Sequence, residues 1–328
     1  MNQITALKDI MNKSRIIGTG SYLPERVLTN NDLTKLVDTS DKWIIERTGI
    51  RQRHIAAENE TTADIAYQSS LRALKSADTS VKDIDLIVLA TTTPDNTFPS
   101  TATKVQAMLG MKHGAAFDIQ AVCSGFIYAL AVGDNFIKAG QAERVLVIGA
   151  ETFSRLLDWK NRETCVLFGD GGGAVILSKE KGDKGILSTH LHSDGRYGDL
   201  LYADGGPSTT QSVGLVKMSG KEVFRHAVVN LATVVDEALA ANSCKRSDID
   251  WLVPHQANLR ILSNTARKLG LSEDQVVITV QHHANTSAAS IPLALDEAVR
   301  DGRIKEGHLI LMEAMGGGFT WGAALVRW

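Results

Sequence analysis

An internal repeat constrains this chain more than any other feature of its sequence. The segment Asp83–Ala90 (DIDLIVLA) has a close counterpart about 165 positions later, in Asp248–His255 (DIDWLVPH). Val145 and His308–Leu311 keep nearly the same offset, and Phe168–Leu177 has a looser counterpart in Phe319–Val326. The repeat predicts two related α/β halves, each with the order strand, helix, strand, helix, strand. Such halves bury helices against each other and place a site between them.

The composition is that of a globular protein without a strong overall charge. The 328 residues are 44% hydrophobic and 22% charged, which excludes disordered and fibrous chains. A formal net charge of −2 argues against a nucleic-acid partner, and the lack of any apolar run of ~18 residues argues against a membrane span. Residues 1–10 lack the apolar core of a secretory signal and are interpreted as an N-terminal extension. Three widely spaced cysteines form no disulfide framework, so we expect a reducing, cytoplasmic setting.

The two halves are expected at residues 11–184 and 185–328. Within them, continuous apolar runs predict buried strands and periodic apolar positions predict helices. The predicted strands are 15–20, 85–90, 115–119 and 144–149, and the predicted helices are 61–76, 124–139, 221–242 and 291–301. The first of these helices opens on a capping-box sequence, Thr61–Asp64.

Cys123 lies where a predicted strand ends and a helix of small residues begins. At such a junction, free backbone N–H groups and the positive end of the helix dipole stabilise a thiolate. The sequence therefore predicts a nucleophilic cysteine with a lowered pKa, and inert core packing is the alternative. Cys165 and Cys244 lack this setting and are interpreted as structural.

Two polar residues of the second half are expected close to Cys123. His255 follows a predicted strand, at the carboxyl end where α/β sheets hold their sites. Asn285 falls near the repeat counterpart of Cys123, just before the helix 291–301. A satisfied loop histidine and an ordinary N-cap asparagine are the competing interpretations.

A cysteine, a histidine and an asparagine brought together fit two chemistries. In the first, a Cys–His pair hydrolyses its substrate as papain-like enzymes do. In the second, the histidine and asparagine donate hydrogen bonds to a thioester oxygen while an enolate forms, and an acylated cysteine accepts that carbon nucleophile. A duplicated fold that points one helix from each half at a single centre favours the second chemistry.

The remaining motifs are weak. Gly18–Leu23 has only part of a dinucleotide-binding fingerprint and is not followed by a helical pattern. The histidine pairs 190/192 and 282/283 have no accompanying carboxylate or cysteine cluster in the sequence, so we expect no metal site.

Four separated motifs resemble the β-ketoacyl-acyl-carrier-protein synthase III family, the ketosynthases that start bacterial type II fatty-acid synthesis. They are AVCSGF (121–126), VPHQANLR (253–260), HANTSAAS (283–290) and GGGFTWG (316–322). The likeness covers nearly all of residues 11–328. It implies a thiolase-like, five-layered αβαβα fold, a homodimer, and no permanently bound cofactor, with a coenzyme A thioester as substrate.

The resemblance also implies a mechanism. Cys123 would take an acyl group, typically acetyl, from coenzyme A. His255 and Asn285 would bind the thioester carbonyl of malonyl-acyl carrier protein and stabilise the enolate left by decarboxylation, which attacks the acyl-cysteine. The products would be a β-ketoacyl-acyl carrier protein, CO₂ and free coenzyme A. The backbone N–H groups of Cys123 and Gly317 would form the oxyanion hole.

The same resemblance assigns three further groups of residues. The coenzyme A groove would contain Trp43 against the adenine, Arg47 on phosphate, Arg162 beside the adenine, and Asn258 near the pantetheine. The acyl pocket would contain Met315 and Phe98, the latter reaching into the partner subunit. The basic patch for the acidic acyl carrier protein would be Arg225, Arg260, Arg267 and Lys268.

Two departures from the family pattern leave the primer open. Met315 stands where many members have phenylalanine, and the loop Pro94–Phe98 differs, so longer or branched primers compete with acetyl. The sequence is also compatible with a related condensing enzyme of secondary metabolism, with a Cys–His–Asn thioester hydrolase and with a non-enzymatic acyl-CoA-binding protein. Thiolase itself is disfavoured, because no second cysteine lies near Gly316.

Overall fold

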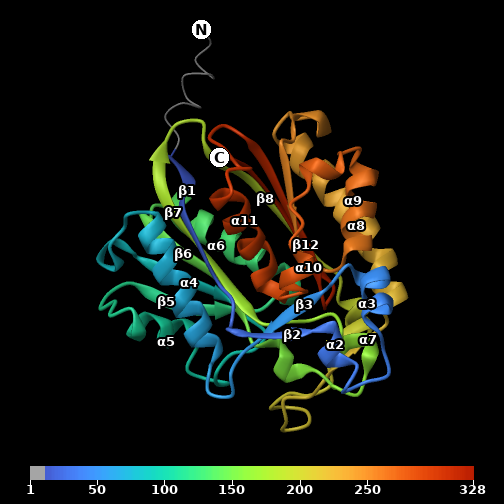
Figure 1. Ribbon diagram of the computed structural model, residues 1–328. Helices are drawn as coiled ribbons and strands as arrows, with labels where there is room; N and C mark the ends of the chain where they lie inside the picture. The colour runs from blue at the N-terminus through green and yellow to red at the C-terminus, as the bar shows by residue number, and fades with distance from the viewer. Residues whose placement is uncertain (1–11) are drawn as a thin grey trace.

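The computed structural model describes residues 12–328, and the extension predicted at residues 1–10 lies outside that range (Figure 1). Five strands form the first sheet, in the order β1 (Asn12–Tyr22), β7 (Gly171–Lys181), β6 (Arg144–Glu151), β4 (Leu86–Ala90) and β5 (Ala115–Ile119). β4 runs parallel to β5 and β6, whereas β7 runs antiparallel to β1 and β6. β4 and β6 are buried almost throughout, which is why their sequences are continuous apolar runs.

The second sheet repeats this order with one strand fewer. Its strands are β11 (Trp251–Pro254), β12 (Leu309–Gly316), β13 (Thr320–Arg327) and β8 (Gly185–Ser193), in that order across the sheet. β11 is parallel to β12, and β13 is antiparallel to both of its neighbours. In strand order, β11, β12, β13 and β8 correspond to β4, β6, β7 and β1 of the first sheet. The position that corresponds to β5 is occupied by an isolated parallel bridge between Leu252 and Val276. The duplicated architecture predicted from the repeat is confirmed.

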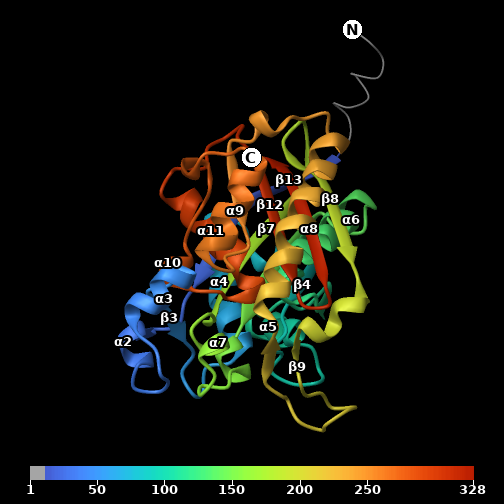
Figure 2. The same cartoon turned by 90° about the vertical axis from the view of Figure 1, so that its right-hand side faces the viewer.

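Helices complete five layers (Figures 1 and 2). α6 (Gly125–Lys138) and α11 (Ser290–Arg300) lie between the two sheets and share one apolar core with both. α4 (Thr62–Ser76) and α5 (Thr101–Met108) cover the outer face of the first sheet, and α8 (Gly220–Ala241) and α9 (Leu259–Leu269) cover that of the second. The αβαβα prediction is therefore confirmed, and α4 begins at the predicted capping box of Thr61 and Asp64.

Short elements gather at one end of the layers. They are β2 (Arg26–Thr29), β3 (Gln52–Ile55), β9 (Leu201–Ala203), β10 (Val216–Met218), α2 (Asn30–Leu33), α3 (Asp41–Thr48), α7 (Arg162–Cys165) and α10 (Val280–His283). Short 3₁₀ turns are η1 (Val81–Asp83), η2 (Val122–Ser124), η3 (Phe153–Leu156), η4 (Gly195–Leu200), η5 (Arg246–Asp248), η6 (Glu273–Gln275) and η7 (Ser287–Ala289). Within residues 12–328, no helix has both the length and the apolar character that crossing a membrane requires.

Two turns that precede the central helices meet in the middle of the molecule. η2 leads into α6 and η7 leads into α11, and the two turns pack against each other and against β6 or β12. A glycine permits this approach: a Cβ at Gly149 of β6 would lie 2.2 Å from the carbonyl oxygen of Ala288. The repeat thus brings the residues of both turns to one centre.

Candidate active site

One cavity collects the three side chains that the sequence analysis placed together. Cys123, His255 and Asn285 all line it, and they come from η2, from the loop after β11 and from the loop before η7. The cavity opens between α3, α8 and α9, and its other lining residues include Arg47, Leu167, Phe168, Leu201, Phe224, Ala227, Leu231, Asn258, Arg260 and Met315. A nucleophile and two polar groups therefore share one enclosed, mostly apolar space.

Cys123 is 4% exposed, and its environment corrects one prediction. Burial raises the pKa of the Cys123 thiol to about 12. The prediction of a lowered pKa was wrong because the turn before α6 is covered by η7 and β12 instead of facing solvent. The thiol is thus the resting form, and a neighbouring group has to accept its proton before it can attack.

His255 is held by the second sheet. Its backbone N–H donates to the carbonyl oxygen of Glu313 on β12 at 2.8 Å. Its Nδ1 has no hydrogen-bond partner among residues 12–328, and burial lowers the pKa of His255 to about 3. The imidazole is therefore neutral, and one ring nitrogen carries a proton that it can donate as a hydrogen bond.

Asn285 is fixed on three sides by backbone. Its N–H donates to the carbonyl oxygen of Leu167 at 2.9 Å, and its own carbonyl oxygen accepts from Gly169 at 3.0 Å. Its side-chain Oδ1 accepts from the Ser287 N–H at 2.9 Å. Because the side-chain oxygen is already engaged, Asn285 presents its amide N–H₂ as the free donor. Asn285 and His255 are both neutral donors, which suits them to a thioester oxygen that gains negative charge.

The ring of Trp43 is contacted by two arginines, one of which, Arg47, lines the cavity. The guanidinium carbon of Arg47 lies 4.5 Å from the centre of the Trp43 ring, and that of Arg162 lies 5.0 Å from it. Arg162 also donates to the carbonyl oxygen of Asp38 at 2.9 Å. The predicted adenine and phosphate residues are thus neighbours, and Arg47 reaches into the cavity lining.

The other predicted residues divide into two sets. Asn258, Arg260 and Met315 line the cavity, and Asn258 also caps α9 through a bond from the Ile261 N–H. Outside the lining are Phe98, whose residue surface is 81% exposed, together with Gly317, Arg225, Arg267 and Lys268. Gly316, the neighbour of Gly317, passes so close to η2 that a Cβ there would lie 2.7 Å from the Cys123 nitrogen.

Two buried carboxyl groups near the cavity were missed by the sequence analysis. Glu151 ends β6 and Glu313 lies on β12, and both are almost completely buried. Burial raises the pKa of Glu151 to about 7 and that of Glu313 to about 8. In the sequence, each glutamate stands in or at the end of an apolar strand run. A glutamate at an exposed strand end gives the same pattern, so the sequence did not indicate that these two are buried.

Glu313 leads to a prediction about stability. Its folded-state pKa of about 8 exceeds the ordinary value of 4.5, so the folded state holds a proton that the unfolded state loses. The free energy of unfolding should therefore fall as the pH rises from about 5 to about 8. Glu313→Gln should weaken this fall by at least about 1.4 kcal/mol, the equivalent of one pKa unit.

Urea unfolding at pH 6, 7 and 8 measures this effect. The control is Glu306→Gln, because the pKa of the exposed Glu306 is lowered by its bond to Lys184 and the residue stays ionised over that range. Equal slopes with pH for wild type and Glu313→Gln would show that Glu313 does not hold the proton.

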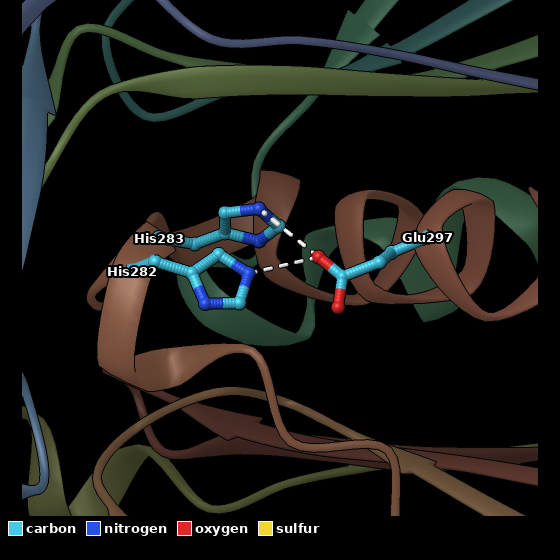
Figure 3. A group of neighbouring side chains, drawn as sticks. All are labelled: His282, His283 and Glu297. Atoms are coloured by element: carbon cyan, nitrogen blue, oxygen red, sulfur yellow. Dashed lines mark hydrogen bonds and ion pairs between the residues drawn. The ribbon is translucent and has the colours of Figure 1, made fainter. Parts of the chain in front are cut away.

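Each histidine pair has a carboxylate beside it in the folded chain, which the sequence did not reveal. His282 Nε2 lies 2.8 Å from Glu297 Oε2, and His283 Nε2 lies 3.5 Å from the same atom (Figure 3). His190 Nδ1 lies 3.1 Å from Glu237 Oε1, and His192 Nε2 lies 2.6 Å from Glu237 Oε2. The sequence did not show these contacts because each glutamate lies on a helix outside the segment that carries its histidines. Glu297 also pairs with Arg303 at 3.3 Å, so this group forms a charge network that joins α10 to α11.

The five layers, with a cysteine, a histidine and an asparagine on one cavity between the halves, define a thiolase-fold protein. The family model for 3-oxoacyl-[acyl-carrier-protein (ACP)] synthase III matches residues 117–195. The model for the C-terminal part of the same family matches residues 239–328. A β-ketoacyl-[acyl-carrier-protein] synthase III of Paramagnetospirillum magneticum is 68% identical over 320 residues, covering 96% of this chain and 99% of that protein. The chain belongs to the 3-oxoacyl-[acyl-carrier-protein] synthase III family.

Solved structures agree with this assignment. The 3-oxoacyl-[acyl-carrier-protein] synthase III of Aquifex aeolicus is 50% identical with a TM-score of 0.92, covering 96% of this chain and 100% of that one. The priming β-ketosynthase of the R1128 polyketide biosynthetic pathway is 33% identical with a TM-score of 0.91, covering 97% of each chain. The family resemblance of the four motifs is thus confirmed over nearly the whole chain.

Proposed function

We propose that this protein condenses an acyl-CoA primer with malonyl-acyl carrier protein, with loss of CO₂, as the initiating step of fatty-acid synthesis. The observation that carries the proposal is the convergence of Cys123, His255 and Asn285 on one cavity. A hydrolase would need the nucleophile and a base, whereas here burial lowers the pKa of His255 to about 3, which makes it a weak base, and Asn285 presents its amide donor. Two neutral donors serve an enolate oxygen better than they serve water activation.

The reaction takes place in two halves at one sulfur atom. In the first, Cys123 Sγ attacks the acyl carbon of the primer and coenzyme A leaves, with the backbone N–H groups of Cys123 and Gly317 as proposed oxyanion donors. In the second, His255 and Asn285 hold the malonyl thioester oxygen while CO₂ departs. The enolate carbon then bonds to the acyl carbon and releases the cysteine.

The mouth of the cavity is the proposed binding site for coenzyme A. Trp43 offers a ring for the adenine, with Arg162 beside it, and Arg47 offers a guanidinium group for phosphate. Asn258 lies further in, where the pantetheine would pass. No group in this proposal requires a permanently bound cofactor.

The acyl carrier protein is proposed to dock on α8 and α9 beside the mouth. Arg225 lies on α8, and Arg260, Arg267 and Lys268 lie on α9, where their charges complement an acidic partner. Homodimerisation is proposed as well, because the exposed Phe98 has the surface that a partner subunit would cover.

The patch gives a kinetic prediction. Arg267→Glu with Lys268→Glu should raise the KM for malonyl-acyl carrier protein at least about tenfold at low salt, because like charges then face the acidic partner. The KM for acyl-CoA should change little. Lys305→Glu, an exposed residue beyond α11, is the control. An equal rise for both substrates, or no rise at all, would exclude the patch as the docking surface.

The primer is tested by steady-state kinetics with a series of acyl-CoA thioesters. Acetyl-CoA is proposed as the preferred primer, and malonyl-acyl carrier protein as the preferred extender over malonyl-CoA. The series includes longer and branched acyl chains because Met315 lines the cavity, and its flexible thioether can change the shape of the acyl pocket. A maximum at long chains would instead assign the protein to the related condensing enzymes of secondary metabolism. Acyl release to water without any malonyl donor would assign it to the hydrolases.

A further inference from the structure

Three side chains of α10 and α11 meet at a point outside the cavity lining. His282 and His283 are the last two residues of α10, and Glu297 lies on α11. Two imidazole nitrogens and one carboxylate oxygen of this group all lie within 4.8 Å of one another. Figure 3 shows both imidazoles directed at the same oxygen of Glu297. Two histidines and a glutamate are a ligand set that zinc enzymes use.

The spacing of these atoms is close to that of ligands around one ion. Zinc bonds of about 2.0–2.1 Å in a tetrahedron place neighbouring ligand atoms about 3.4 Å apart. His283 Nε2 lies 3.5 Å from Glu297 Oε2, so this pair already has that spacing. His282 Nε2 lies at 2.8 Å and has to move outward slightly. The two rings are nearly perpendicular, at 81°, with centres 4.4 Å apart, so their nitrogens approach the oxygen from different directions.

His283 is buried without an ordinary hydrogen bond. It is 6% exposed, and its Nδ1 has no hydrogen-bond partner among residues 12–328. The 3.5 Å between its Nε2 and Glu297 is longer than the usual N–H···O distance of about 2.7–3.2 Å. Whichever ring nitrogen carries the proton, one nitrogen is left without a partner of normal geometry. Such a buried polar atom is costly, and an ion bonded to Nε2 would satisfy it there.

Access and charge both favour a cation at this point. The side chains of His282 and Glu297 are 38% and 33% exposed, so an ion can enter from solvent and water can complete its coordination. Glu297 Oε1 pairs with Arg303 at 3.3 Å, which orients Oε2 toward the histidines as outer ligand partners do. Asp301 pairs with the same arginine at 2.7 Å. Two carboxylates therefore face one guanidinium, and the local charge with neutral histidines is negative.

We propose that His282, His283 and Glu297 bind one divalent transition-metal ion of the zinc type, which joins α10 to α11. Imidazole nitrogen is a ligand for zinc and its neighbours in the first transition row, whereas Mg²⁺ takes oxygen ligands. The sequence gave no reason to expect this site, because Glu297 lies on another helix. The proposal goes beyond the proposed function, since neither half-reaction uses the ion.

The second histidine pair provides a matched control. His190 Nδ1 lies 3.1 Å from Glu237 Oε1, and His192 Nε2 lies 2.6 Å from Oε2, so the two nitrogens contact different oxygens. His190 Nε2 is also 2.9 Å from the Ser188 hydroxyl. This pair has the same composition but its nitrogens do not share one oxygen. The side chain of His192 is 39% exposed, which matches the 38% of His282.

Isothermal titration of the full chain with zinc chloride, in buffer free of chelators, tests the site. His282→Ala should lower the affinity for Zn²⁺ at least about tenfold, because loss of an outer partner of a ligand alone costs about 10–100-fold. Glu297→Gln, which keeps the shape of the side chain, should lower it as well. His192→Ala should bind Zn²⁺ as wild type does. Magnesium chloride should give no binding at this site.

Thermal unfolding gives a second measurement on the same proteins. Zinc should raise the Tm of wild type and of His192→Ala more than that of His282→Ala, because an ion bound only to the folded chain stabilises it. His282 is largely at the surface, so its alanine variant should fold.

Three results would overturn the metal site. They are a wild-type protein that binds no Zn²⁺, equal zinc affinities in wild type and His282→Ala, and Mg²⁺ binding as tight as that of Zn²⁺. None of them involves an acyl-CoA. The proposed function is decided separately, by whether acetyl-CoA acylates Cys123.

Discussion

Cys123→Ala is expected to reduce condensation of acetyl-CoA with malonyl-acyl carrier protein by at least about 10³-fold. Cys123 is the cysteine that lines the cavity, so its sulfur is the atom proposed to carry the acyl group between the two half-reactions. Alanine removes the sulfur while filling most of the buried space, so the fold should persist. Product formation followed by mass spectrometry of the carrier protein measures the loss.

The other two cysteines provide the control for this variant. Cys165 is buried beside α3 and β3, and Cys244 is partly exposed near α8, and neither lines the cavity. Cys244→Ala should keep nearly full activity. A Cys123→Ala protein with activity within tenfold of wild type would show that no acyl-cysteine is needed.

His255→Ala and Asn285→Ala are expected to separate the two half-reactions. Each variant removes one donor from the oxygen that becomes negative during decarboxylation, and loss of such a donor costs about 10²–10³ in rate. Acylation of Cys123 should survive, because both side chains are proposed to act on the malonyl thioester in the second half-reaction and not on the primer. The measurement is CO₂ release from malonyl-acyl carrier protein beside single-turnover acylation with acetyl-CoA.

The matched control for these variants is Gln256→Ala. Gln256 follows His255 directly, but its side chain is buried, and its amide N–H₂ donates to the carbonyl oxygens of Pro254 and Val277. It should lose stability without separating the two half-reactions. Decarboxylation at the wild-type rate in either His255→Ala or Asn285→Ala would contradict the roles given to those residues.

Local signals made the architecture predictable. The repeated runs at Asp83 and Asp248 identified two strands that occupy matching places in the two sheets, and Thr61 marked the start of a helix correctly. These features depend on neighbours in the sequence, so a single sequence reveals them. The convergence of Cys123 and Asn285 followed from the same repeat, because each lies before a central helix.

Properties set by packing between distant segments could not be predicted. The raised pKa of Cys123 depends on how η7 and β12 cover the turn, and the helix dipole alone suggested the opposite direction. Glu151 and Glu313 look like strand residues in the sequence, and only the closed fold shows that both are buried. The carboxylates beside the histidine pairs come from other helices for the same reason.

Peptide mapping of the protein after brief exposure to an acyl-CoA primer tests the central claim most directly. The account predicts an acyl group on Cys123 alone, stable in buffer and discharged when malonyl-acyl carrier protein is added, with one CO₂ released for each acyl group lost. An acyl group found only on Cys165 or Cys244, or one that water removes as fast as the malonyl donor does, would contradict it.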